Sequence, residues 1–187
     1  LIFIVKIKNI MTICILGNTL TALTLAKALV NQKIDVDVLF NKKNYKISDS
    51  RTIGIAKNNV NFFNNNIINI EKIIWKLKNI EIFSENLKKE KLINFKANND
   101  YLFSIVKNNK LYQLLEKDLS NNKFFRSQFS NEKNLSFLNK YELIINCDSS
   151  NLITNRYFSK KIIKKYNSYA YTTIIKHDEI LNDTAFQ

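Results

Sequence analysis

Apolar and polar positions alternate with two different periods in the first part of the chain. Residues 12–16 form a short apolar run that ends at Gly17, and from Leu20 apolar residues recur every three or four positions in a stretch rich in alanine and leucine. Residues 34–40 are β-branched and alternate again. Strand, glycine turn, helix and strand within about 30 residues predict one βαβ unit with two parallel strands.

The pattern beyond residue 40 predicts further strands and helices. The interpretation is a polar loop over 41–48, a helix after the segment 49–56, a hairpin of strands near 80–84 and 92–97, a strand over 100–106, an amphipathic helix over 110–120, a buried strand over 141–147 and a strand over 169–177. These elements predict an α/β chain with a Rossmann-like portion, whose strands lie near residues 12, 34, 101 and 142 and whose helices lie near 20 and 110.

The turn between the first strand and the first helix is a candidate phosphate site. A dinucleotide pyrophosphate binds the free N–H groups at a helix N-terminus, and the usual fingerprint is GxGxxG or GxGxxA. Here residues 17–22 read GNTLTA, so Thr19 stands in place of the second glycine and Ala22 in place of the third. The second strand ends in Phe40 rather than in an acid that would hold a ribose. Two interpretations stay open at this point: a dinucleotide-binding turn and a plain packing turn.

Charge and composition restrict the partners. The formal net charge is +13, yet only three of the 29 basic residues are arginine and the lysines are spread along the chain. Because arginine does most base and phosphate recognition, we expect no nucleic-acid partner and consider an anionic membrane surface the better candidate. Cys14 and Cys147 lie in apolar runs and are expected to be buried thiols of a reducing cytosol. The single histidine, His177, argues against a zinc site or a catalytic triad.

The uncharged stretch from residue 9 to 26 raises the alternative of a signal peptide or a membrane span. Its many threonine and asparagine residues argue against a span, and a signal peptide would leave the following helix and strand unexplained. Met11 has the character of a natural start, so residues 1–10 are expected to be an upstream or disordered extension.

Five segments together resemble the N-terminal half of the ubiquinone-biosynthesis flavin hydroxylases, within the aromatic-ring flavoprotein monooxygenases. They are ILGNTLTALTLAKAL from residue 15, DSRTIGIA from residue 49, YLFSIVKNNKLYQLLEKDL from residue 101, YELIINCDSS from residue 141 and YAYTTIIKHDEILNDTAFQ from residue 169. The first is similar to the FAD pyrophosphate motif, the second to an arginine-bearing segment along the flavin, and the fourth to an Asp-Gly motif.

The resemblance implies a Rossmann-like FAD-binding fold, over 11–78 and 100–160, with the beginning of a β-rich substrate portion over 79–99 and 161–187. The cofactor-binding residues that it implies are Gly17, Asn18, Thr19 and Leu20 at the pyrophosphate, Arg51 along the cofactor, and Asp148 near the reductant path. It implies no catalytic side chain and no metal. Ser149 replaces the glycine of Asp-Gly, Arg156 falls one place late, and the family's third motif would lie beyond Gln187, so we expect a truncated chain.

The function implied is FAD-dependent hydroxylation of an aromatic ring of a polyprenylated ubiquinone precursor, with NAD(P)H and O₂. We expect a cytoplasmic protein, peripheral at the inner membrane face and in contact with a ubiquinone-synthesis complex. The rivals are another FAD oxidoreductase and a flavin-free paralogue that acts as an assembly partner. Three simpler interpretations also stay open: Arg51 as a solvated loop residue, Asp148 as the N-cap of a helix over 149–156, and His177 as an exposed strand end.

Overall fold

The computed structural model describes residues 12–40, 49–84, 90–98, 100–129, 136–149 and 151–157, and residues 160, 162, 164–171, 173–175, 178 and 183–187 of the tail. The predictions for residues 1–10, for Met11, for the loop 41–48 and for His177 lie outside these residues. By its internal contacts the chain divides into two units, Leu1–Tyr45 with Leu115–Lys165, and Lys46–Leu114 with Tyr166–Gln187. Each unit is described by itself.

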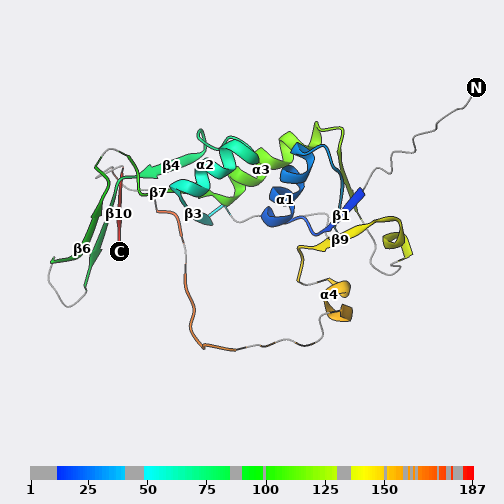
Figure 1. The fold of residues 1–187 in the computed structure, drawn as a ribbon. Coiled ribbons are helices and arrows are strands. Elements are labelled where there is room, and N and C mark those ends of the chain that lie inside the picture. The colour runs from blue at the N-terminus through cyan, green and yellow to red at the C-terminus, as the bar shows by residue number, and fades with distance from the viewer. Residues whose placement is uncertain are drawn as a thin grey trace, which may run out of the picture. The chain divides into compact units, whose positions relative to one another are not determined.

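The first unit is built on the predicted βαβ start (Figure 1). β1 (Thr12–Leu16) and β2 (Asp35–Phe40) pair in parallel, from Thr12 opposite Asp35 to Leu16 opposite Leu39. α1 (Leu20–Asn31) connects them and packs on both strands. Its buried face carries small and aliphatic side chains, Ala22, Leu23, Ala26 and Val30. The sequence prediction of a parallel crossover is therefore confirmed.

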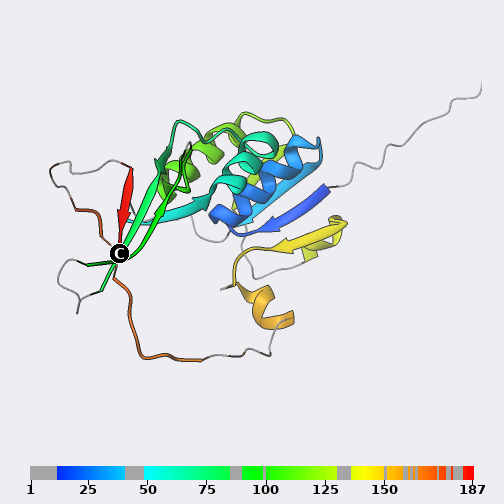
Figure 2. The same cartoon turned by 60° about the vertical axis from the view of Figure 1, so that its left-hand side comes forward.

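Two further parallel strands complete this sheet, in the order β8-β2-β1-β9. β8 (Phe125–Phe129) pairs with β2, and β9 (Leu143–Asn146) pairs with β1. Figure 2 shows β1 (blue) and β9 (yellow) side by side. The sequence did not predict β8. The predicted strand over 141–147 is confirmed at residues 143–146. The prediction that it is buried is wrong, because β9 is the edge strand of the described sheet and leaves Leu143 and Ile144 exposed.

One face of the parallel sheet is covered by the segments around β9. Its buried cluster joins β1 and β2 to η1 (Ser136–Lys140) and α4 (Leu152–Tyr157). The members are Cys14, Leu16, Leu39, Leu138, Tyr141 and Ile153. Strand alternation assigns Ile13, Ile15, Val36 and Val38, all buried, to the opposite face. Both cysteines are free thiols, and burial raises the pKa of Cys14 to about 12.

The second unit begins with a three-stranded antiparallel sheet in the order β3-β7-β4. These strands are β3 (Thr52–Ala56), β4 (Ile74–Leu77) and β7 (Phe103–Lys107). α2 (Lys57–Asn66) follows β3 without a break, and α3 (Asn108–Ser120) follows β7 in the same way. α3 buries Leu111, Leu115 and Leu119, the apolar stripe that its sequence predicts, and it crosses the boundary between the units at residues 114 and 115.

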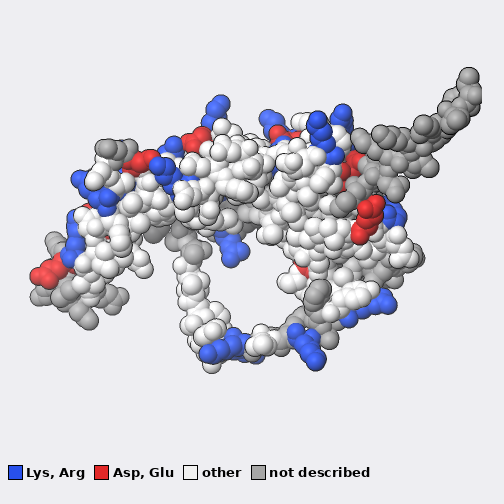
Figure 3. All heavy atoms as spheres, in the orientation of Figure 1, with Lys and Arg blue, Asp and Glu red and all other residues white. Residues whose placement is uncertain are grey.

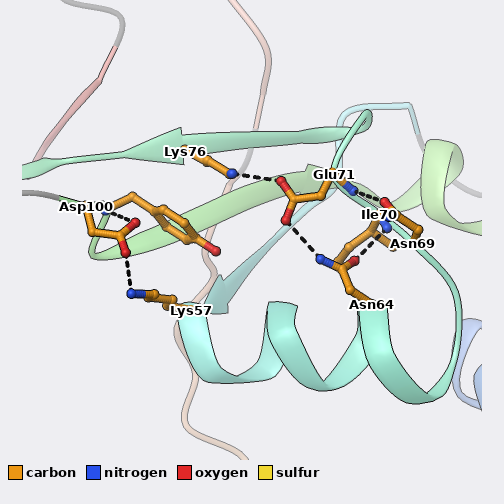
Figure 4. Close-up of polar contacts among 8 residues, drawn as sticks. Lys57, Asn64, Asn69, Ile70, Glu71, Lys76 and Asp100 are labelled. Atoms are coloured by element: carbon orange, nitrogen blue, oxygen red, sulfur yellow. Dashed lines mark hydrogen bonds and ion pairs between the residues drawn. The ribbon is translucent and has the colours of Figure 1, made fainter.

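Polar side chains connect the end of α2 to β4 (Figure 4). Asn64 accepts a hydrogen bond from the backbone N–H of Ile70 at 2.9 Å and donates its amide to Glu71 at 2.9 Å. Glu71 in turn pairs with Lys76 of β4 at 2.7 Å. At the start of α2, Lys57 pairs with Asp100. In a chain without proline these asparagine contacts fix the turn.

The second sheet of this unit has the order β10-β5-β6. β5 (Asn79–Phe83) and β6 (Lys91–Lys96) form the predicted antiparallel hairpin, with an irregularity at Ile82 and Phe83. β10 (Thr184–Phe186) pairs in parallel with β5 and was not predicted. The predicted strand over 169–177 is wrong for the described residues 169–171 and 173–175, which form no strand and are exposed.

The division by contacts groups residues 46–78 with 79–99, whereas the resemblance assigns them to different portions. The functional division into FAD-binding and substrate portions stays a prediction. Within the described residues no helix is both long enough and apolar enough to cross a bilayer. The same residues contain no group of three or more metal-binding side chains.

Candidate functional site

The turn after β1 contains a glycine that the surrounding backbone requires. Gly17 has a φ of +108° and donates its N–H to the carbonyl oxygen of Leu39 at 2.7 Å. A Cβ at this position would lie 2.9 Å from the Cβ of Asp148 and 3.3 Å from its backbone nitrogen. The segment that leaves β9 thus passes directly over Gly17. The turn and this segment meet at the carboxyl ends of β1 and β9, where ligands bind in open parallel sheets.

Thr19 opens α1 as its N-cap. Its backbone is extended, with φ −98° and ψ 167°, and its hydroxyl oxygen accepts a hydrogen bond from the N–H of Ala22 at 3.3 Å. Because this conformation is not left-handed, threonine fits here without backbone strain. The cap engages the N–H of Ala22. By their position in the first turn, the N–H groups of Leu20 and Thr21 have no acceptor inside the helix, so they are the donors that a phosphate could use.

The segment after β9 is held by a polar cluster. Asn146 accepts hydrogen bonds from the backbone N–H of Asp148 at 3.1 Å and from the amide of Asn151 at 2.8 Å. It also donates its own amide to the hydroxyl of Thr154 at 2.6 Å. That hydroxyl lies 3.0 Å from the carbonyl oxygen of Asp148. Asn151 and Thr154 are buried, so these contacts fix the backbone of Asp148 against Gly17.

The N-cap of α4 is Asn151 rather than Asp148. The side-chain oxygen of Asn151 accepts a hydrogen bond from the backbone N–H of Thr154 at 2.8 Å, and the helix begins at Leu152. The alternative that Asp148 caps a helix over 149–156 is therefore wrong, because the helix starts later than the sequence indicated. Arg156 is exposed on α4, with its guanidinium 5.7 Å from the ring centre of Tyr157.

The structure brings Gly17, Asn18, Thr19, Leu20 and Asp148 together in the first unit. Arg51 belongs to the second unit, directly before β3, where its side chain is exposed and its carbonyl oxygen accepts a hydrogen bond from Asn108 at 3.0 Å. Its role along a cofactor stays a prediction, as does the role of Asp148 near a reductant.

Sequence reasoning missed a buried carboxylate in the middle of β2. Asp37 is 4% exposed at its side chain, pairs with Arg126 of β8 at 2.6 Å, and accepts a hydrogen bond from the hydroxyl of Tyr141 at 2.7 Å. Burial and this hydrogen bond raise the pKa of Tyr141. The sequence signal that could have revealed Asp37 is an aspartate inside an alternating run. At that position the side chain of a strand residue lies against one face of the sheet. Asp37 serves the packing of β8 and η1 against β2.

We expect Thr19→Ala to lower the free energy of unfolding by about 1 kcal/mol, because the N–H of Ala22 loses its cap. Urea denaturation of wild type and variant measures this difference. Thr21→Ala is the matched control: Thr21 lies on the exposed side of the same turn, and we expect its replacement to change stability by less than about 0.5 kcal/mol. Equal losses in the two variants would contradict the capping role.

The fold is a mixed α/β fold with a parallel sheet, and over part of the chain it matches solved structures of FAD-dependent monooxygenases. No protein-family model and no curated protein matches the sequence, whereas solved structures do match the fold. PqsL of Pseudomonas aeruginosa, described as a probable FAD-dependent monooxygenase, aligns with a TM-score of 0.60 and 11% identity over 83% of this chain and 47% of PqsL. p-Nitrophenol 4-monooxygenase PnpA of Pseudomonas putida aligns with a TM-score of 0.54 and 12% identity over 64% of this chain and 32% of PnpA.

A third structure, 2-methyl-3-hydroxypyridine-5-carboxylic acid oxygenase, aligns with a TM-score of 0.54 and 13% identity over 65% of this chain and 32% of that protein. Identities this low show a shared fold and nothing finer. In each of the three cases the chain spans less than half the length of the matched protein.

Proposed function

We propose that this chain is part of an FAD-dependent aromatic monooxygenase and that its first unit binds the FAD pyrophosphate. The observation that carries the proposal is the geometry at Gly17: a left-handed turn, closely covered by the segment after β9, that leads directly into the N-terminus of α1. A Cβ would fill this cradle, and the helix dipole favours an anion beside it. The likeness of fold to PqsL and PnpA supports the same proposal.

The residues present fit a pyrophosphate. The N–H groups of Leu20 and Thr21 would donate to phosphate oxygens, and the buried Ala22 lets α1 pack close to the sheet, as the third position of the fingerprint requires. The cluster around Asn146 would keep Asp148 at the edge of the site. FAD would supply the oxygen chemistry, and residues of the chain would bind it, orient it and exclude water.

The finer parts of the proposal rest on the resemblance of the five segments. They are reduction by NAD(P)H, a polyprenylated phenol of ubiquinone synthesis as substrate, and association with a ubiquinone-synthesis complex. Thr19 at the turn, Phe40 at the end of β2 and Ser149 after Asp148 depart from the family's pattern. These three departures favour the rival in which the protein binds no flavin and acts as an assembly partner. A measurement of FAD binding distinguishes the FAD-dependent enzyme from the flavin-free rival.

Replacing Leu20 by proline tests one of the two proposed donors, the N–H of Leu20. Proline is tolerated at the first position of a helix, and the extended backbone of Thr19 is the conformation that a residue before proline requires. The variant therefore removes one N–H and keeps the helix. We expect FAD to bind about 10- to 100-fold more weakly, the effect of losing one hydrogen bond to a charged group. Quenching of flavin fluorescence during titration of the full-length protein measures this.

Leu20→Ala is the matched control, since it removes the same side chain and keeps the N–H. We expect it to bind FAD within about threefold of the wild type. Equal weakening in both variants would refute donation by the Leu20 amide. A full-length wild-type protein that is colourless and does not quench flavin fluorescence would refute the proposal itself in favour of the flavin-free rival.

A further inference from the structure

One part of the tail combines basic and apolar side chains that the fold does not cover. We name it the basic–apolar segment: the described residues 160, 162, 164–171 and 173–175. All of them are exposed and none lies in a helix or strand. Among the large apolar side chains of the described residues, the five most exposed all lie here, at 72% to 104% of full exposure. They are Ile162, Tyr166, Tyr169, Tyr171 and Ile175.

The charge of this stretch has one sign. The sequence from Lys160 to Lys176 contains five lysines and no aspartate or glutamate. Elsewhere in the sequence lysines are interspersed with aspartate and glutamate, and some of them form ion pairs, as Lys27 does with Asp118 and Lys91 with Glu81. Figure 3 shows this difference in charge in one view: the described residues of the basic–apolar segment carry blue and white spheres, whereas red spheres lie among the blue ones elsewhere. The basic–apolar segment therefore attracts anions and at the same time offers apolar surface.

An anionic lipid bilayer satisfies both properties. Tyrosine rings are favoured at the level of the lipid headgroups, where the ring is buried and the hydroxyl stays hydrated. Isoleucine side chains bury apolar surface when they enter the boundary between the headgroups and the acyl chains, which is favourable. Each lysine near an anionic leaflet adds about 1 kcal/mol of attraction. Single-stranded nucleic acid fits less well, because the segment has no arginine and isoleucine offers no ring on which a base can stack.

We propose that the basic–apolar segment docks the protein on the surface of a bilayer that contains anionic phospholipid. The lysines hold the segment at the headgroups, and the tyrosine and isoleucine side chains insert at the boundary with the acyl chains. This inference goes beyond the proposed function and does not rest on FAD binding.

Vesicle co-sedimentation of the full-length protein tests the proposal. We expect binding to phosphatidylcholine vesicles that contain about one third phosphatidylglycerol, and much weaker binding to phosphatidylcholine alone. Lys160→Gln, Lys164→Gln and Lys165→Gln combined should weaken binding to the anionic vesicles roughly a hundredfold. Tyr169→Ser, Tyr171→Ser and Ile175→Ser combined should weaken it at high salt as well, because the apolar contribution is not screened.

The matched control removes three exposed lysines from elsewhere, Lys33→Gln, Lys72→Gln and Lys110→Gln. It makes the same change of net charge and should keep binding within about threefold of the wild type. Circular dichroism verifies that all variants stay folded. Equal losses in control and segment variants would overturn the proposal in favour of a general charge effect. Release from vesicles by single-stranded RNA, with tighter binding to that RNA, would overturn it in favour of nucleic acid.

Discussion

Gly17→Ala is expected to lower the free energy of unfolding by about 2–5 kcal/mol and to abolish FAD binding. Two independent costs add. An L-residue at φ +108° costs about 1–2 kcal/mol of backbone strain, and the new methyl group would lie 2.9 Å from the Cβ of Asp148, an overlap that costs about 1–3 kcal/mol to relieve. Relief would move the segment after β9 away from α1 and would open the proposed phosphate cradle. Urea denaturation and flavin titration measure the two effects.

The other glycine of the chain supplies the control. Gly54, in the middle of β3, has no positive φ, and a Cβ there would meet the ring of Phe103 at 3.5 Å, an ordinary contact. We expect Gly54→Ala to change stability by less than about 1 kcal/mol, with a gain favoured because alanine loses less backbone entropy. Should Gly17→Ala be as stable as Gly54→Ala, the close passage over Gly17 would be contradicted.

The elements that the sequence predicts correctly are those with local causes. β1, α1 and β2 follow from a change of apolar period around Gly17, and the β5–β6 hairpin follows from alternation in two nearby runs. β8 reads FRSQF, with two apolar residues in five, and becomes a strand because β2 lies beside it. That pairing joins residues about 90 positions apart, and no window along the chain contains both partners.

The tail shows the opposite error. Tyr169 and Tyr171 alternate with small or polar residues, which is typical of a strand, yet the described residues here form none. A strand gains stability only when a neighbour accepts its hydrogen bonds and covers one face. β5 is instead joined by β10, only three residues long. Alternation thus indicates that a segment is able to form a strand, whereas hydrogen bonding to a neighbouring strand determines whether it does.

The candidate site likewise contains residues that the sequence predicts and residues that it does not. Gly17 and the start of α1 are predictable because glycine is scarce in this chain and a helical period begins three residues later. The network of Asn146, Asn151 and Thr154 is not predictable from the sequence, because the chain contains many asparagines. Which of them form hydrogen bonds here depends on how α4 packs on the end of β9. The position of Arg51 along a cofactor would come from the family pattern alone, and it stays a prediction.

Asp37→Ala is expected to lower the free energy of unfolding by about 3 kcal/mol, the upper end for leaving a buried hydrogen-bond donor without its acceptor. The carboxylate of Asp37 is 4% exposed, whereas Arg126 is 49% exposed and can return to water when its partner is lost. The hydroxyl of Tyr141 cannot, because this side chain is buried in the cluster beside Cys14. Most of the loss should therefore arise from Tyr141 rather than from the ion pairs with Arg126 and Lys140, whose side chains are both exposed.

A double-mutant cycle separates the two contributions. Tyr141→Phe alone should cost about 1 kcal/mol, and in the Asp37→Ala background it should cost nothing or stabilise, since it removes an unsatisfied hydroxyl. Arg126→Ala should couple to Asp37→Ala by less than about 1 kcal/mol, because the guanidinium stays hydrated. Asp35→Ala, at the start of β2, is the control and should lie within about 0.5 kcal/mol of the wild type. A larger coupling to Arg126 than to Tyr141 would show that the ion pair, rather than the hydroxyl, holds η1 and β8 to the sheet.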